Sequence, residues 1–223
     1  GCRMRCQYCH NPDTWKLSGG TAWEARELFC RAWQYRSYWR NNGGITVSGG
    51  EPLLQMEFVT ELFRLAREKG VHTALDTAGQ PFSREASFLE PFRRLLEVTD
   101  LVLLDLKAMD SGLHRQLTGW DNAPILDMAR YLSDQGMPLW IRHVLVPGLT
   151  DSREELEQLE AFVGELPTVE RVEILPYHTL GVGKWAELGI PYPLAGVRPR
   201  TEEEAEAAQR YLSAAVRALP KAE

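Results

Sequence analysis

Five short runs of hydrophobic residues recur along the chain, and we interpret them as buried β-strands. They lie at residues 45–48, 71–76, 101–106, 139–146 and 171–175. Several of them are rich in Val, Ile and Leu on both faces. This pattern is typical of parallel strands that are covered on both sides.

The segments between these runs carry hydrophobic residues at helical spacing. One helix is marked by Leu28, Phe29 and Ala32, and another by the stripe from Val59 to Ala66. Capping-box patterns and glycine stops then set the expected bounds. One helix is expected to begin at a capping box at residues 21–24, and the helix with the Val59–Ala66 stripe is expected to end at Gly70. Further helices are expected from Ser83 to Leu96, over 123–135, after a capping box at 152–155, and from Thr201 to about Leu219.

Strands that alternate with helices predict βαβ units and a parallel sheet. The expected fold is α/β, a partial (β/α) barrel, in one domain spanning residues 1–223. In such barrels the active site lies at the C-terminal ends of the strands. Polar residues gather at those ends, in Ser48–Glu51, Asp76–Thr77, Asp105–Lys107, Arg142–His143 and Tyr177–His178.

The charge balance narrows the range of partners. The net charge of −6 argues against a nucleic-acid-binding protein, which would show a basic face. No apolar run approaches the roughly 20 residues needed to span a bilayer, so no membrane partner is expected. The acidic residues 202–206 are interpreted as the solvated start of a helix.

Three of the four cysteines, Cys2, Cys6 and Cys9, form a C-x3-C-x2-C run. Three thiolates can ligate three irons of a cubane cluster and leave the fourth iron open. An open metal position is where substrate chemistry takes place. Cys30 falls within a helical pattern and is expected to be a small buried hydrophobe. A zinc site completed by His10 is the alternative, and clustered thiols indicate a reducing compartment.

The cysteine run and the strand-end motifs together resemble a known family. G-C-R-M-R-C-Q-Y-C-H-N at 1–11 resembles the cluster loop of radical S-adenosylmethionine enzymes. More narrowly, the chain resembles the activases of glycyl radical enzymes, above all those of pyruvate formate-lyase, from residue 1 to about 200. The segments that carry this are C-H-N-P-D-T-W (9–15), V-S-G-G-E-P (47–52), L-D-T-A-G (75–79), L-D-L-K (104–107), W-I-R-H-V-L-V-P-G (140–148) and I-L-P-Y-H (174–178). The chain departs from the family at Ala78, where Asn is common.

The resemblance implies a reaction and its components. A [4Fe–4S] cluster on Cys2, Cys6 and Cys9 would reductively cleave S-adenosylmethionine, and the 5′-deoxyadenosyl radical would take a hydrogen atom from a glycine of pyruvate formate-lyase. Residues 10–45 contain one cysteine and no ferredoxin-like insert, so an external donor such as flavodoxin is expected. A cytoplasmic monomer is implied.

Roles for the strand-end residues follow from chemistry and from the resemblance. Gly49 and Gly50 let the backbone approach the substrate closely, and Glu51 can accept from its ammonium group. Two facing carboxylates are costly without a cation between them. The resemblance implies a monovalent cation bound by Asp76, Thr77, Asp105 and the Leu103 carbonyl, with Lys107 and Arg142 balancing the substrate carboxylate. The alternative is that Asp76, Asp105, Lys107 and Arg142 form structural ion pairs.

The resemblance also assigns residues around the adenosine and the partner. Tyr8, Asn11 and His178 are expected to touch the adenosine portion of the substrate. Trp15 follows the cluster loop and is expected to help seat the partner protein. The alternative functions are an activase of another glycyl radical enzyme, a small-molecule radical enzyme and a non-catalytic electron carrier. The electron carrier does not explain the polar residues at the strand ends.

Members of the family carry a strand that runs into the cysteine loop, and here Gly1 stands directly before Cys2. We therefore expect residues 45–48 to pair only with residues 71–76, leaving an exposed sheet edge. We also expect the cysteine loop to be poorly anchored at its N-terminal end.

Single alanine substitutions test the cysteine assignment. Cys2→Ala, Cys6→Ala and Cys9→Ala are each expected to abolish cluster binding and cleavage of S-adenosylmethionine, because each removes one of three thiolate ligands. Cys30→Ala is the matched control and should keep both. Iron content and 5′-deoxyadenosine formation are the measurements. Full activity in Cys6→Ala would contradict the assignment.

Overall fold

A computed structural model describes the backbone of residues 1–39 and 43–217 and the side chains up to residue 210. Its sheet has five parallel strands in the sequential order β1-β2-β3-β4-β5. This confirms the expected partial barrel. The strands are β1 (Gly44–Val47), β2 (His72–Thr77), β3 (Leu101–Asp105), β4 (Leu139–Leu145) and β5 (Val169–Pro176).

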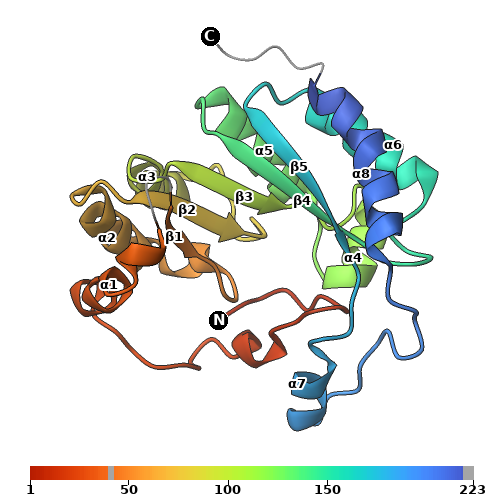
Figure 1. Cartoon of the computed structure of the whole chain (residues 1–223), viewed down its shortest axis with the longest axis horizontal. Coiled ribbons are helices and arrows are strands. Elements are labelled where there is room, and N and C mark those ends of the chain that lie inside the picture. Colours follow the sequence, from red (N-terminus) through yellow and green to blue (C-terminus); the bar gives the residue numbers. More distant parts are fainter. Residues whose placement is uncertain (40–42, 218–223) are drawn as a thin grey trace.

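Most helices cover the outer face of the curved sheet, whereas the N-terminal segment and α7 lie on the opposite side (Figure 1). Two helices, α4 and α7, have no counterpart among the sequence expectations. In the described residues, none of the helices is long and apolar enough to cross a bilayer. The helices are α1 (Ala25–Trp33), α2 (Met56–Arg67), α3 (Ala86–Leu96), α4 (Ser111–Thr118), α5 (Ala123–Asp134), α6 (Arg153–Gly164), α7 (Val182–Glu187) and α8 (Glu202–Arg217), with 3-10 turns η1 (Pro12–Trp15), η2 (Arg36–Tyr38) and η3 (Pro52–Gln55).

Two of the expected helix caps are confirmed. The Ser152 hydroxyl accepts from the Glu155 amide, at 3.1 Å. At α8, the Glu204 carboxylate accepts from the Thr201 amide at 2.8 Å and the Thr201 hydroxyl accepts from the Glu204 amide at 3.3 Å, a complete capping box. The expected end of this helix near Leu219 lies outside the described residues.

Two other expected caps are wrong. Helix α1 begins at Ala25 without a side-chain cap, and Thr21 is exposed. The buried face of α1, with Ala25 and Phe29, packs against α2 and sets where the helix starts. Helix α3 begins at Ala86 rather than beside Ser83.

Cys30 is exposed rather than buried, because it lies one helical step from the inward-facing Phe29.

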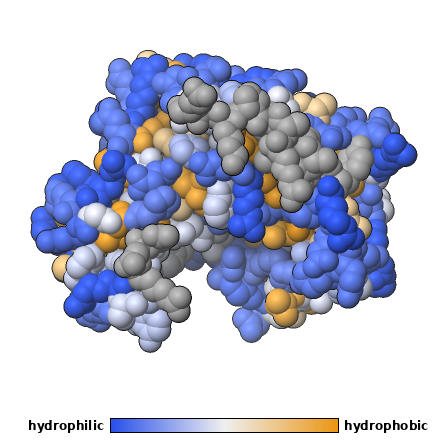
Figure 2. Space-filling model, turned by 45° about the horizontal axis from the view of Figure 1, so that its top comes forward, coloured by the Kyte–Doolittle hydropathy of each residue, from blue (hydrophilic) through white to orange (hydrophobic). Residues whose placement is uncertain are grey.

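The main core fills the space between the sheet and its outer helices. Phe63 of α2, Phe92 of α3 and Leu132 of α5 are fully buried there, together with Leu104 of β3. The hydrophobic residues that remain at the surface are scattered on a largely hydrophilic face (Figure 2). This burial holds the strands in register, so that their C-terminal ends meet on one side.

The expected pairing of β1 is confirmed, but the expected weak anchoring of the cysteine loop is wrong. Among residues 1–39 and 43–217, β1 pairs only with β2, as expected. The cysteine loop, however, is well anchored at its start, because the Gly1 carbonyl accepts from the Glu51 amide at 2.8 Å. The turn after β1 therefore fixes residue 1 without strand pairing.

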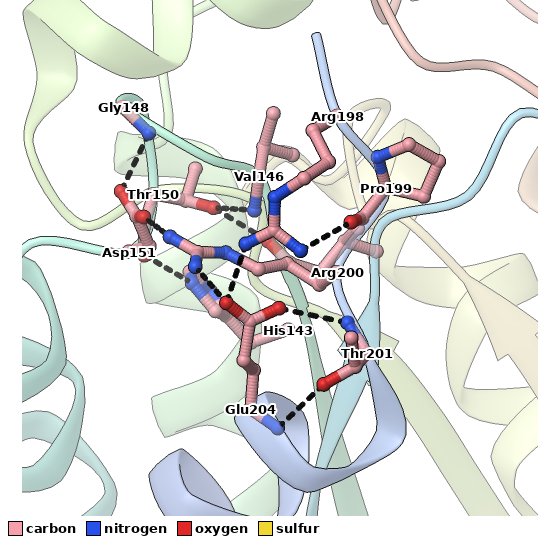
Figure 3. Close-up of polar contacts among 11 residues, drawn as sticks. His143, Val146, Gly148, Thr150, Asp151, Arg198, Pro199, Arg200, Thr201 and Glu204 are labelled. Carbon is pink, nitrogen blue, oxygen red and sulfur yellow. Dashed lines mark hydrogen bonds and ion pairs between the residues drawn. The ribbon is translucent and has the colours of Figure 1, made fainter.

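A polar cluster ties the start of α8 to the loop after β4 (Figure 3). The Arg200 guanidinium binds the carboxylates of Asp151 and Glu204. Asp151 in turn accepts from the Gly148 amide at 2.8 Å. The buried His143 ring contacts the Leu106 and Thr150 carbonyls at 2.8 and 3.1 Å. These contacts place the N-terminus of α8 beside the C-terminal ends of β3 and β4.

Phe92→Ala tests the contribution of this core. Phe92 is fully buried, so its truncation leaves a cavity and is expected to lower the free energy of unfolding by about 3–5 kcal/mol. Leu180→Ala is the control, because Leu180 is 86% exposed, and should change it by less than about 0.5 kcal/mol. Denaturant titrations of both variants measure the difference. Equal effects would contradict the assignment of Phe92 to the core.

Candidate functional site

The polar strand ends and the cysteine loop meet in one cavity of about 530 Å³. It lies where barrel architecture places an active site. Glu51 and Leu103, which were also expected in the site, do not line it. The expected residues that do line it are Cys2, Cys6, Tyr8, Cys9, Asn11, Gly49, Gly50, Asp76, Thr77, Asp105, Lys107, Arg142 and His178.

Parts of the fold that are distant in sequence hold the cysteine loop in place. Carbonyl groups at the C-terminal end of α4 accept from the Arg5 and Gln7 amides at 2.9 and 2.8 Å. The last carbonyls of a helix have no partner within the helix, so the loop caps α4. At the other end of the loop, the Trp185 indole of α7 donates to the Cys9 carbonyl at 2.8 Å.

The three thiols are free and face the same cavity. Burial raises the pKa of all three and takes that of Cys6 to about 12. Buried thiols are converted to thiolates when a metal binds them, because the metal supplies the missing positive charge. The three cysteines on one loop, facing a roomy cavity, therefore fit a cubane cluster with one open iron.

The zinc alternative needs His10 as the fourth ligand beside the three thiols. Zinc needs four ligands converging on one ion, with sulfur at about 2.3 Å. The His10 ring instead stacks on His178, with ring centroids 4.0 Å apart.

The turn after β1 combines backbone exposed to the cavity with a buried carboxylate. Gly49 adopts a positive φ of 134°. A Cβ on Gly50 would lie 2.2 Å from the Gly1 carbonyl oxygen, so only glycine allows this approach. Glu51 is buried and accepts from the Thr77 hydroxyl at 2.5 Å and from the Ala78 amide at 3.0 Å. The Glu51 side chain thus braces the turn against the end of β2.

Asp76, Asp105, Lys107 and Arg142 form one ion-pair network at the ends of β2, β3 and β4. Arg142 contacts both carboxylates, and the Lys107 ammonium lies 3.1 Å from Asp105. This is the geometry of the ion-pair alternative. A cation bound by Asp76 and Asp105 would have to displace Arg142 from at least one of them.

The network sets the charge states of its members. Burial alone would raise the pKa of Asp105, but Lys107 and Arg142 hold it below its ordinary value. Burial and the neighbouring Asp105 raise the pKa of Asp76. Burial by itself lowers the pKa of Lys107, yet Asp105, Tyr8 and Cys6 outweigh it and raise that pKa well above its ordinary value. Lys107 therefore remains a cation within the cavity.

The remaining expected residues line the side of the cavity near α7. Tyr8 is buried, and its hydroxyl has no hydrogen-bond partner among the residues that the structure describes. The Lys107 ammonium lies 5.7 Å from the Tyr8 ring centroid. The Asn11 amide oxygen accepts from the Lys184 ammonium at 2.8 Å. His178 extends this wall through its stack on His10.

Two residues contribute to the site in ways that the sequence reasoning missed. Trp15, which is expected to help seat the partner, also lines the cavity and meets the Trp185 ring edge-on, with centroids 5.0 Å apart. Glu202, at the start of α8, also lines the cavity. The capping box at Thr201 identified this helix, but no local signal shows that its first turn reaches the site.

Gly50→Ala tests the close approach of the two backbones. The added Cβ is expected to push Gly1 and Cys2 away and to lower the iron content severalfold, because it would overlap the Gly1 carbonyl. Gly164→Ala is the matched control, since a Cβ there meets nothing within 4 Å. Iron per chain after anaerobic reconstitution is the measurement. Equal loading of both variants would rule out the proposed contact.

Comparisons with known proteins agree with this geometry. Residues 1–160 match the sequence family described as the Radical SAM superfamily. The pyruvate formate-lyase-activating enzyme of Streptococcus mutans is 53% identical over 214 residues, which are 95% of this chain and 81% of that protein. That of Listeria monocytogenes is 50% identical, over 95% of this chain and 86% of its own.

Solved structures show the same fold. A domain of a pyruvate-formate lyase-activating enzyme from Bacteroides vulgatus superposes with a TM-score of 0.62 at 26% identity, covering 78% of this chain and 95% of that one. Streptococcus suis SuiB bound to S-adenosylmethionine shares the fold with a TM-score of 0.68 at 19% identity, over 95% of this chain and 44% of SuiB. This chain belongs to the radical SAM superfamily and, within it, to the family of pyruvate formate-lyase-activating enzymes.

Proposed function

We propose that this chain cleaves S-adenosylmethionine reductively and directs the resulting radical to a glycine of pyruvate formate-lyase. The observation that carries the proposal is the meeting of three free thiols, a Gly-Gly turn and a mixed-charge network in one cavity. Cys2, Cys6 and Cys9 would hold a [4Fe–4S] cluster, which would supply the electron for cleavage of the carbon–sulfur bond. The family relationship supports the same reaction.

Different residues of the cavity are assigned to different parts of S-adenosylmethionine. Gly49 and Gly50 offer backbone without side chains beside the amino-acid end of S-adenosylmethionine. Lys107 and Arg142 balance its carboxylate, while Asp76 and Asp105 keep both cations in position. Glu51 acts by holding the Gly-Gly turn. A monovalent cation near Asp76, Thr77, Asp105 and the Leu103 carbonyl belongs to this proposal, with Arg142 moving to admit it.

The adenosine portion is assigned to the opposite wall. Tyr8, Asn11 and His178 all line the cavity. The Tyr8 hydroxyl is buried and has no hydrogen-bond partner among the described residues. Asn11 is oriented by Lys184. Because these residues stand around the cysteine loop, the nucleoside would lie beside the thiols.

The partners and setting follow from the same reasoning. We infer that an external protein donor, flavodoxin, delivers the electron, since residues 10–45 hold one cysteine and no second cluster motif. We also propose that the protein is a monomer of one domain and that it works in the reducing cytoplasm.

Anaerobic incubation with S-adenosylmethionine and a reductant tests the reaction. The reconstituted chain is expected to form 5′-deoxyadenosine, and added pyruvate formate-lyase should develop a glycyl-radical doublet in its electron paramagnetic resonance spectrum. Cys6→Ala is the negative control and Cys30→Ala the positive one. Product without any glycyl radical would favour a small-molecule enzyme.

A second glycyl radical enzyme tests the choice of partner. Only pyruvate formate-lyase is expected to become activated, because the chain's family is defined by that partner. Activation is measured as spins per partner chain at matched concentrations. Success with the second enzyme and failure with pyruvate formate-lyase would overturn the partner assignment.

A further inference from the structure

Helix α7 and its N-cap residue contact the last part of the cysteine loop at several points. Gly181 packs so closely that a Cβ there would lie 2.6 Å from the His10 Cα. The Lys184 ammonium binds Asn11 and Asp13 at 2.8 and 3.0 Å. These ion-pair contacts are solvent-exposed, where such pairs contribute little. The buried contact of Trp185 is therefore the one expected to matter most.

Trp185 combines burial with a directed hydrogen bond. It is 2% exposed, and its indole N–H donates to the Cys9 carbonyl at 2.8 Å. Its ring meets those of Trp15 and Tyr192 edge-on, with centroids 5.0 and 5.2 Å away. Packing against both rings leaves the buried indole little freedom to turn. The hydrogen bond thus has a fixed direction toward Cys9.

The Cys9 backbone is held on both of its polar groups. Its amide donates to the Cys6 carbonyl at 3.0 Å, which closes the turn between two of the thiols. Its carbonyl is held only from outside the loop, by Trp185, among the hydrogen bonds of the described residues. Losing a donor to a partly buried carbonyl costs about 1–3 kcal/mol. The same ring also supports Trp15, which lies beside the Cys9 thiol and helps to lower its pKa against the effect of burial.

We propose that Trp185 is a positioning residue for the cluster ligand Cys9, acting through the indole hydrogen bond to its carbonyl. This inference rests on the proposed cluster. It goes further by assigning to α7 a role in holding that cluster. Without the bond, residues 9–11 can shift relative to Cys6, and the third thiolate then departs from the geometry that the other two require.

The chain offers a matched control for the test. Trp120 makes the same type of bond, from its indole N–H to the Arg3 carbonyl at 3.1 Å, but it is 40% exposed. Trp185→Phe and Trp120→Phe each remove one indole donor to the cysteine loop and keep an aromatic ring. Water can replace the donor at Arg3, whereas the packed surroundings of Trp185 exclude it.

The experiment uses reconstituted wild-type protein and both variants under anaerobic conditions. We measure the rate of iron release to a chelator, and the electron paramagnetic resonance spectrum of the reduced cluster with and without S-adenosylmethionine. Trp185→Phe is expected to release iron at least fivefold faster than wild type and to show an altered spectrum. Trp120→Phe should stay within twofold, with an unchanged spectrum.

The outcomes separate this inference from the proposed function. A wild-type protein that holds no cluster would refute the proposed function itself. A wild-type protein that holds one, with Trp185→Phe matching Trp120→Phe in both readouts, would overturn only the role of Trp185.

Should Trp185→Phe fail to fold, Trp185→His provides the second variant. Its smaller ring loses packing but keeps an N–H donor. Iron release within twofold of Trp120→Phe is then expected. Release at least fivefold faster than from wild type would show that packing alone matters and would refute the inference.

Discussion

The cysteine loop has no regular secondary structure between Gly1 and Asn11, so its shape depends on hydrogen bonds to other parts of the fold. The turn after β1 holds Gly1, the end of α4 holds residues 5–7, and α7 holds Cys9. Each bond contributes only about 0.5–1.5 kcal/mol. Together they fix three thiols that would otherwise move independently, and every other feature of the site is arranged around them.

This dependence explains why the loop is supported by elements spread over most of the chain. A ligand set for a cluster must be held to a fraction of an ångström. A loop on the surface of a barrel cannot provide that precision alone. The parallel sheet supplies the rigid platform, because its strands are buried beneath packed helices. Helices α4 and α7 then hold the cysteine loop in place through hydrogen bonds to its backbone.

Charge balance is the second constraint on the cavity. Two carboxylates and two cations share a partly buried site, so every ion has a partner of opposite sign. A buried charge left alone would cost several kcal/mol. A zwitterionic ligand can enter such a site by exchanging partners, because its own ammonium and carboxylate replace the internal pairs. The charges of the network therefore stay paired both with and without a bound zwitterion.

The sequence by itself determined the strands, most of the helices, the thiol triad and the set of strand-end residues. These depend on local rules: hydrophobic spacing decides an element, and strand direction decides which ends meet. Local rules failed at Thr21 and Ser83, where packing overrode a cap pattern, and at Cys30, where one helical step decided exposure. Only the tertiary structure decided that Glu51 braces the turn, that Arg142 bridges Asp76 and Asp105, and that Trp185 holds Cys9. Such contacts join residues tens to nearly two hundred positions apart, and no local pattern encodes which distant side chain arrives at a given backbone group.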